Sequence, residues 1–187
     1  MALFARDRFV ADCEAAVAAG DGQRAIRALL DEAASDRTRV MAELGAPKRA
    51  GIEVLHRSNN MTILNLVWGP HMTVMPHNHH MWAAIGLYAG REDNIFWRTL
   101  PTDAKRPLEA AGASSYFPGD IGMLGPDIIH SVSNPLGKLT GALHIYGGDF
   151  LKQEREQWDE ETMVQCPYDT AAARKLFEDS NRFLERA

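Results

Sequence analysis

Cysteine is scarce in this chain, and basic residues show no excess. Cys13 and Cys166 are the only cysteines among 187 residues, and they lie much farther apart in the sequence than the cysteines of a metal-binding motif. Neither a disulfide framework nor a thiolate zinc site is therefore indicated. The formal net charge of -5 gives no basic footprint for nucleic acid, so we expect a small-molecule partner. Seven histidines against two cysteines shift any metal hypothesis toward imidazole ligands.

Long apolar runs are also missing. The most apolar stretches, such as 61–68, fall far short of the roughly 20 residues that a membrane span requires. The first residues carry Arg6, Asp7, Arg8 and Asp12, where a secretory signal would need an uninterrupted apolar segment. We therefore expect a cytoplasmic protein without a membrane partner. The choice between a monomer and a homo-oligomer stays open.

The length and the change of pattern along the chain predict a single domain with three parts. An N-terminal helical segment, a β-barrel and a C-terminal helical extension are expected over 1–48, 49–150 and 151–187. In the first part apolar residues recur at helical spacing, and Gly20 and Gly45 are expected to stop two of the helices. Asp21 is placed to cap the second helix.

Short runs rich in β-branched and aromatic residues fill the middle part, separated by Gly, Pro, Asn and Asp. Such runs are typical of β-strands joined by turns, and many of them favour a closed or sandwiched antiparallel barrel. The expected strands cover 52–57, 61–68, 72–77, 79–88, 93–99, 113–117, 121–124, 129–133 and 139–146. Beyond them, residues 150–161 and 169–186 have helical composition, with Asp169 as the N-cap of the second helix.

The segment VMPHNHHMW contains the most informative pattern, His77 and His79 at positions i and i+2. On one strand these side chains point to the same face, whereas Asn78 and His80 point to the other. A third histidine, His130, follows two turns in PGDIGMLGPDIIHSVSN, and a barrel would bring it beside the first pair. Imidazole suits iron, zinc, copper or nickel, and three such ligands leave positions open for substrate and oxygen. We therefore expect the three histidines to bind one metal ion.

A second same-face pair, His144 and Tyr146, lies in the apolar segment GALHIYGGDF. Taken alone, this pattern also fits a core histidine that is satisfied by a tyrosine hydroxyl. If both side chains face the barrel interior, their polar ends approach the metal. The phenol could then donate a hydrogen bond to bound oxygen or sulfur.

These segments resemble the paired motifs of cupins, and together they are similar to the cysteine dioxygenase family. The similarity runs over 52–155, through WGPHMTVMPHNHHMWAAIGLYAGRE, GDIGMLGPDIIHSVSNP and LHIYG. Within that family, HxHxxW followed by a small residue and IG looks closer to the bacterial 3-mercaptopropionate dioxygenases. The resemblance implies a mainly β fold, the cupin double-stranded β-helix or jelly-roll barrel, with N-terminal helices and a C-terminal helix. It also implies iron(II) on His77, His79 and His130, and a Ser-His-Tyr relay that includes His144 and Tyr146.

Two positions depart from the related patterns. The general cupin motif places a glutamate a few residues after HxH, where this chain has Ala83 and Ala84. Three histidines then replace a three-histidine-one-carboxylate set, in agreement with the thiol dioxygenases. The relay serine corresponds to Ala142, which leaves the orientation of His144 to another group or to a water molecule.

The resemblance implies a dioxygenase that uses iron(II) and O2 to oxidise a small carboxylated thiol, of the 3-mercaptopropionate or cysteine type, to its sulfinate. Arg155 matches the carboxylate-binding arginine of the bacterial branch, and Arg57 is a second candidate. Alternatively, Arg155 pairs with Glu154 or Glu156 on a solvated helix. Another three-histidine oxygenase, such as a diketone-cleaving one, and a non-catalytic metal-bound cupin that senses a small ligand stay open, as do nickel and zinc.

Overall fold

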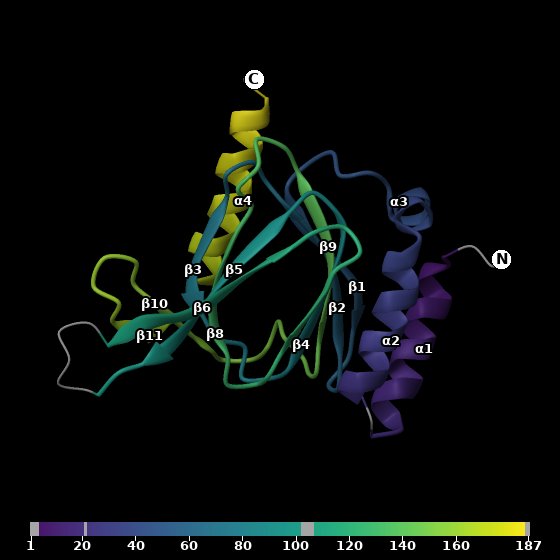
Figure 1. Cartoon of the computed structure of the whole chain (residues 1–187), viewed down its shortest axis with the longest axis horizontal. Helices are drawn as coiled ribbons and strands as arrows, with labels where there is room; N and C mark the ends of the chain where they lie inside the picture. Colours follow the sequence, from purple (N-terminus) through teal and green to yellow (C-terminus); the bar gives the residue numbers. More distant parts are fainter. Residues whose placement is uncertain (1–3, 21, 102–106, 186–187) are drawn as a thin grey trace.

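The computed structural model describes residues 4–20, 22–101 and 107–185 (Figure 1). The three expected N-terminal helices are present as α1 (Arg6–Ala18), α2 (Gly22–Ser35) and α3 (Arg37–Leu44). Gly20 and Gly45 follow two of them with φ of 83° and 86°, a backbone conformation that favours glycine. Asp21, the expected cap of the second helix, lies outside the described residues. None of the helices in the described ranges combines the length and the apolar character needed to cross a membrane.

The strands form two antiparallel sheets whose order is that of a jelly roll. The first sheet runs β1 (Gly51–Arg57), β2 (Thr62–Trp68), β9 (Thr140–Tyr146), β4 (Ala83–Ala89), β7 (Ile121–Leu124). The second runs β11 (Gln165–Pro167), β10 (Glu156–Trp158), β3 (Thr73–His77), β8 (Ile129–Ser133), β5 (Glu92–Thr99), β6 (Leu108–Tyr116). From β2 to β9 the chain crosses between the sheets at every step except β5 to β6, as in a double-stranded β-helix. The expected fold, a mainly β cupin barrel with helices at both ends, is confirmed.

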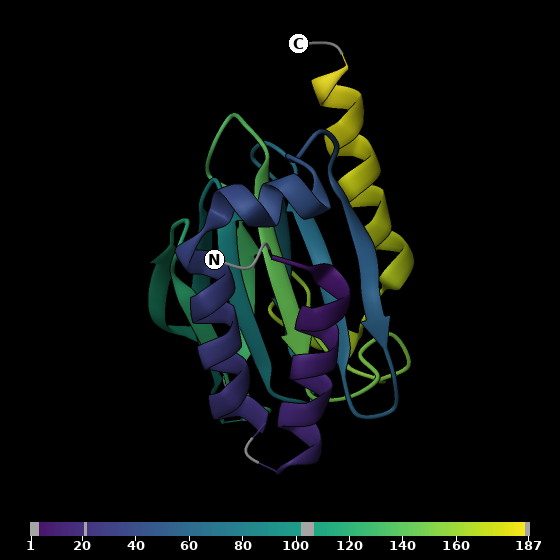
Figure 2. The ribbon, with the colours of Figure 1, turned by 90° about the vertical axis from the view of Figure 1, so that its right-hand side faces the viewer.

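The inner strands β2, β9 and β4 of the first sheet are buried on both faces. Figure 2 shows α1, α2 and α3 lying over its outer face. Successive side chains of β9 alternate between two apolar clusters: Leu143 and Ile145 join the helices, whereas Ala142 and Tyr146 join the barrel interior. This double burial explains why β2 and β9 are almost continuously apolar in sequence.

The C-terminal part differs from the expectation. Residues 150–161 do not form a helix, because this segment contains turns and β10, which pairs with β3 and with β11. The helix expected over 169–186 is present as α4 (Thr170–Leu184), and Asp169 caps it by accepting from the backbone N–H of Ala172 at 2.9 Å. Phe177 of α4 stacks on Trp68 with ring centroids 5.6 Å apart, which fixes the helix against the barrel.

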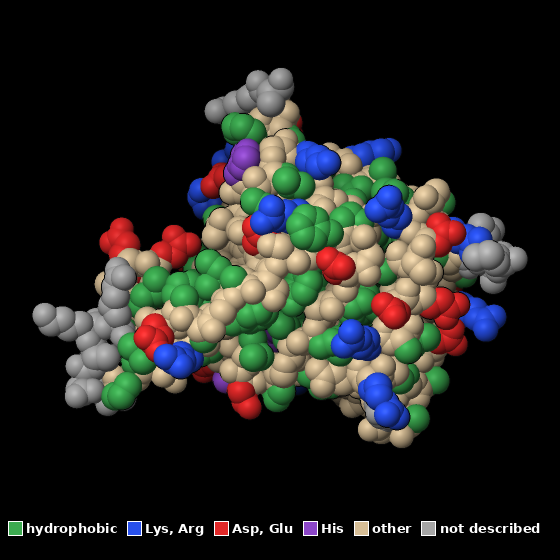
Figure 3. All heavy atoms as spheres, viewed as in Figure 1, with side chains coloured by type: hydrophobic (Ala, Val, Ile, Leu, Met, Phe, Trp, Pro, Cys, Tyr) green, Lys and Arg blue, Asp and Glu red, His purple; other side chains and the backbone are tan. Residues whose placement is uncertain are grey.

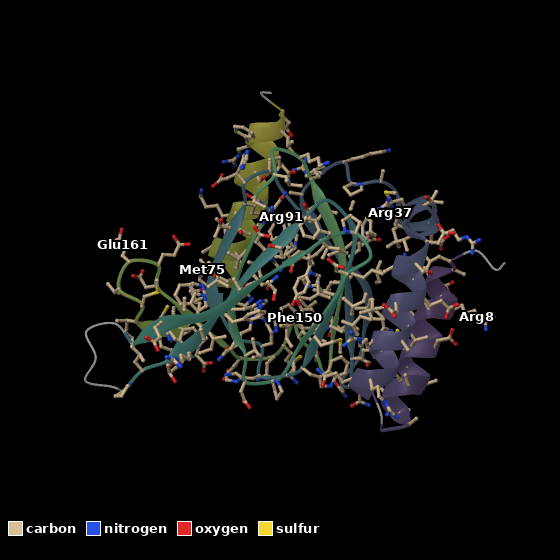
Figure 4. The ribbon with its side chains drawn as sticks, viewed as in Figure 1. Arg8, Arg37, Met75, Arg91, Phe150 and Glu161 are labelled. Carbon is tan, nitrogen blue, oxygen red and sulfur yellow. The ribbon has the colours of Figure 1, made fainter. Side chains whose placement is uncertain are left out.

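Charged side chains of both signs are spread over the face seen in Figure 3 and surround a group of hydrophobic side chains left of centre. The same view with side chains as sticks places Phe150 between the two sheets and Met75 on the side of β3 (Figure 4). The histidines and the tyrosine singled out in the sequence meet in the interior near Phe150.

Candidate metal centre

Three buried histidines converge inside the barrel. His77 is the last residue of β3, and His130 in β8 is its cross-strand partner. His79 lies two residues beyond β3, in the connection to β4. Its Nε2 atom is 3.2 Å from the Nε2 atoms of both His77 and His130. Each of the three residues is less than one tenth exposed.

The expectation that His77 and His79 share one strand is wrong, because β3 ends at His77 and β4 begins only at Ala83. Asn78 nevertheless keeps the chain extended. Its backbone N–H donates to the Glu156 carbonyl at 3.1 Å, and its Oδ1 accepts from the Glu156 backbone N–H at 2.9 Å. Alternate side chains therefore still point the same way, and the two imidazoles meet.

Hydrogen bonds set the tautomer of two of the rings. The Met75 carbonyl can only accept, so His77 donates to it from Nδ1 at 2.9 Å. His130 Nδ1 lies 2.6 Å from the Oδ1 atom of Asn94 and donates to it. In the neutral rings, Nε2 of both histidines then carries a lone pair directed at the shared space. This is the form that ligates a metal ion.

Burial keeps the three imidazoles neutral. Loss of solvation lowers the pKa of His77 to about 4, although the hydrogen bond to Met75 acts in the opposite direction. Desolvation, followed by the charges of neighbouring histidines, holds the pKa of His79 and of His130 well below 6.5. Ligation requires neutral imidazole, so these rings need lose no proton when an ion binds at neutral pH.

The cluster fits a single ion held by imidazoles. Two nitrogens that each lie about 2.1 Å from one ion, at angles of roughly 90–110°, are about 3.0–3.4 Å apart. The Nε2 atom of His79 lies at such a distance from the Nε2 atoms of both other histidines. Among the described residues, the candidate ligand group contains these three histidines and no carboxylate. Ala83 and Ala84 are fully buried where the general cupin motif has its glutamate. Such a donor set suits iron(II), zinc or nickel.

Tyr146 reaches the cluster from the opposite sheet. Its ring is perpendicular to that of His79 at a centroid distance of 5.1 Å and stacks on Phe150 at 3.8 Å. Its hydroxyl lies 3.3 Å from Nδ1 of His144, and both side chains face the barrel interior. Burial raises the pKa of Tyr146, so the phenol keeps its proton at neutral pH. A catalytic role for the pair stays a prediction.

Sequence reasoning missed Glu92 and Asn94, although both are completely buried. Glu92 accepts from the Trp68 indole at 2.7 Å and from the Asn94 amide at 3.0 Å, and it lies 3.3 Å from Nε2 of His144. The available signal was their i, i+2 spacing in REDNIFW, because on a strand this spacing directs two polar side chains to one face.

Arg155 lies beside the cluster, not on a solvated helix. Its guanidinium carbon is 4.0 Å from the ring centroids of both Phe150 and Tyr168, and Nη1 donates to the Phe150 carbonyl at 3.0 Å. The two rings in turn contact the histidines, at 5.6 Å for Phe150 to His79 and 5.7 Å for Tyr168 to His77. Within the described part of the chain, the buried Nε has no hydrogen-bond partner and the guanidinium no carboxylate partner.

Arg57 is not brought to the cluster. Its guanidinium forms a two-point ion pair with Asp149, at 2.8 and 3.0 Å, and its side chain is 45% exposed. Arg155, in contrast, lines a hollow of about 770 Å³ together with Tyr168 and residues of 151–156 and 165–170. Arg155 and Tyr168 thus stand between this hollow and the histidines.

No protein-family model matches the chain. Among solved structures, it is similar to a cupin-family protein with a double-stranded β-helix fold from Methanocaldococcus jannaschii, at 12% identity and a TM-score of 0.44, covering 57% of this chain and 86% of the other. It is also similar to a cupin 2 conserved barrel domain protein from Salinispora arenicola, at 14% identity and 0.40, covering 68% and 82%. Oxalate decarboxylase from Bacillus subtilis, with Mn(II) centres, matches at 14% identity and 0.39, over 49% and 22%. The assignment of the cupin jelly roll rests on the strand order itself.

Proposed function

We propose that this chain is a non-haem iron(II) dioxygenase that oxidises a small carboxylated thiol to its sulfinate. The observation that carries the proposal is the run of contacts from three neutral imidazoles, through Phe150 and Tyr168, to the Arg155 guanidinium. Three histidines leave the charge of a bound divalent ion uncompensated, which favours an anionic ligand such as a thiolate. A molecule that carries both a thiolate and a carboxylate would satisfy the ion and Arg155 together.

The ion, when bound, supplies the chemistry that lets O2 react with the thiolate. A thiol and O2 give a sulfinate and a proton: both oxygen atoms end on sulfur, which loses the four electrons that O2 gains. The protein provides the environment for this reaction. Tyr146 keeps its proton and can hydrogen-bond to the reacting oxygen or sulfur, and the rings of Tyr146 and Phe150 exclude water from the histidine cluster.

The geometry at Arg155 supports recognition of a carboxylate. Two aromatic rings hold the guanidinium plane, so little side-chain freedom is left to lose on binding. One nitrogen is used by the Phe150 carbonyl, while other N–H groups can form the two-point contact that arginine makes with carboxylates.

Oxygen uptake by the iron(II)-loaded protein tests the proposal. The panel contains 3-mercaptopropionate, cysteine, the uncharged thiol 2-mercaptoethanol and the diketone acetylacetone. We expect uptake with a carboxylated thiol, in equal amount to the sulfinate formed. Arg155→Ala and Arg155→Lys should raise KM for that thiol about tenfold or more and hardly affect the uncharged thiol, because a charge-assisted hydrogen bond is lost. Arg57→Ala is the matched control and should change neither.

Each other outcome of this experiment would favour a different function or a different role for Arg155. Uptake with acetylacetone alone would make the protein a different three-histidine oxygenase. Stoichiometric metal binding without oxygen uptake for any compound would favour a non-catalytic protein that binds a small ligand. Equal effects of Arg155→Ala on charged and uncharged thiols would remove Arg155 from the substrate site.

A further inference from the structure

Glu92 is a fully buried carboxylate that lies outside the group of candidate metal ligands. Burial by itself would raise its pKa. The charge of His144 and hydrogen bonds from His144, Asn94 and Trp68 outweigh that effect, so the pKa lies below its usual value. At neutral pH the group is therefore an ionised carboxylate, which can only accept hydrogen bonds. Every polar neighbour must present a donor to it.

One oxygen of Glu92 directs a chain of hydrogen bonds to the metal centre. Oε1 lies 3.0 Å from the side-chain nitrogen of Asn94, so the amide must turn its NH2 group toward Glu92. The carbonyl of the same amide then faces His130, 2.6 Å from Nδ1. Because a carbonyl only accepts, His130 must carry its proton on Nδ1, which leaves the Nε2 lone pair for a metal ion.

The other oxygen of Glu92 directs the contacts of Tyr146. Oε2 accepts from the Trp68 indole at 2.7 Å and lies 3.3 Å from Nε2 of His144, so that nitrogen carries a proton. Nδ1 of His144 is thereby turned to the Tyr146 hydroxyl at 3.3 Å. Ala142, on the same strand, has no group that could do this.

We propose that Glu92 is a positioning residue that fixes, through the direction of its hydrogen bonds, both the tautomer of His130 and the orientation of His144. Its action on Tyr146 matters for catalysis only if the proposed function holds, whereas its action on His130 concerns metal binding alone. One buried carboxylate thereby sets the histidine cluster and the phenol together, and it supplies the polar partner for His144 that Ala142 cannot provide.

The substitution Glu92→Gln tests the first action, because glutamine offers one acceptor and one donor group. The Trp68 indole can only donate, so the glutamine oxygen must face it and the glutamine NH2 then faces the NH2 of Asn94. Asn94 relieves this conflict by turning over, which presents its NH2 to Nδ1 of His130. The His130 proton then moves to Nε2, where it blocks a metal ion.

Two measurements that need no substrate detect this change in the His130 tautomer. Cobalt(II) affinity, measured against a chromophoric chelator, should fall about 10–100-fold in Glu92→Gln. Nitrogen-15 NMR of the histidine rings in the metal-free protein should show His130 with its proton on Nε2. The control is Glu53→Gln, since Glu53 also accepts from an asparagine amide, Asn65, at 3.1 Å, but on the first sheet and half exposed.

The double substitution Glu92→Gln with Asn94→Asp, called the exchanged variant, should restore metal binding. The carboxylate introduced by Asn94→Asp accepts from both His130 and the amide NH2 introduced by Glu92→Gln. The oxygen of that amide accepts from Trp68 and His144, so every hydrogen bond regains a donor and an acceptor. Cobalt(II) affinity should return to near the parental value. In an active enzyme kcat should stay low, since His144 now faces a neutral acceptor.

Parental affinity and an unchanged His130 tautomer in Glu92→Gln would overturn the proposal. So would an exchanged variant that folds without regaining affinity. If Glu92→Gln itself does not fold, the exchanged variant decides alone, because it must both fold and bind cobalt(II). A protein that oxidises no thiol would refute the proposed function and leave these metal-binding results intact.

Discussion

The hydroxyl of Tyr146 can be removed without disturbing the packing of its ring. The ring stacks on Phe150 and contacts His79, and phenylalanine would keep both contacts. We expect Tyr146→Phe to retain metal content and thermal stability but to lose roughly 100-fold in kcat with little change in KM, as when one donor to a reacting group is deleted. Steady-state oxygen uptake and metal analysis of the purified variant measure this.

Tyr88→Phe is the matched control. Tyr88 is also buried and donates its hydroxyl to the side chain of Asn65 at 2.8 Å, but it packs in the cluster beneath the helices. Its loss should leave turnover unchanged. Parental turnover in Tyr146→Phe would assign that tyrosine to the core and remove it from the reaction.

Sequence reasoning identified some residues of the site but not others. His77 and His79 were recognisable because their i, i+2 spacing, weak evidence when taken alone, is followed by a third histidine, His130, in a second hairpin. Glu92 was not, because a glutamate within a strand usually faces water. Its role depends on donors from strands distant in sequence, at Trp68 and His144, and a single sequence does not show which strands become neighbours.

Strand β10 influences the cluster although it carries none of the candidate ligands. Its first residue, Glu156, holds Asn78 through two backbone contacts and through its carboxylate, which accepts from the Asn78 amide at 2.6 Å. These bonds keep the segment between His77 and His79 extended. A short strand from the C-terminal part thus fixes the spacing of two candidate ligands.

The variant Asn78→Ala should weaken both metal binding and folding. Losing the two side-chain hydrogen bonds to Glu156 at a buried position should cost about 1–3 kcal/mol in the free energy of unfolding, and His79 should be held less firmly. Urea denaturation and zinc competition measure the two effects. Asn60→Ala, at an exposed position in the turn before β2, should change neither. Parental zinc affinity in Asn78→Ala would show that the side-chain bonds between Asn78 and Glu156 do not position the ligands.

The strands of the barrel were predictable because β-branched and aromatic runs alternate with clear turn residues. The segment 150–161 was not, because KQEREQWDEE has the charge density of a solvated helix. Tertiary contacts decide its structure: Glu156 bonds to Asn78, and Trp158 is buried beside Ile129. The connection after His77 was misassigned for a related reason, since its extended backbone is paired with Glu156 over only a few residues.

In the molecule as a whole, the first sheet lies between two buried layers of side chains. Helices α1 to α3 cover one face with apolar contacts, and the polar cluster lies on the other. The apolar layer is suited to stabilise the fold. The buried histidines reduce the stability of the metal-free protein at acid pH, because their protonation is suppressed in the folded state.

The metal-free protein should therefore lose stability as the pH falls. An unfolded histidine titrates near 6.5, whereas the pKa of folded His77 is about 4. Between these values the unfolded chain binds more protons, so the free energy of unfolding decreases from pH 6.5 toward pH 4. His77 alone accounts for ~3 kcal/mol at 1.36 kcal/mol for each pKa unit, and His79 and His130 act in the same direction.

Urea denaturation of metal-free protein at pH 7.5, 6 and 4.5 measures this slope. His77→Ala should flatten it. Glu92, whose pKa is lowered, adds a loss of the same sign only below its usual value of 4.5, so its contribution begins at the acid end. A free energy of unfolding that is constant over the range would mean that the histidines are not shielded from solvent protons.

The clamped guanidinium of Arg155 has a consequence for the length of the molecules that the barrel can accept. Phe150 and Tyr168 pack against it on two sides, and the three histidines are buried, so packing restrains the distance between the cation and the ligand cluster. In the proposed reaction, a mercapto acid would have to span that distance with its own carbon chain. Cysteine and 3-mercaptopropionate both place two carbons between sulfur and carboxylate, whereas mercaptoacetate places one and 4-mercaptobutyrate places three, so we expect the protein to distinguish these chain lengths. Discrimination by one methylene then comes from rigidity, since a side chain free to swing would follow either homologue.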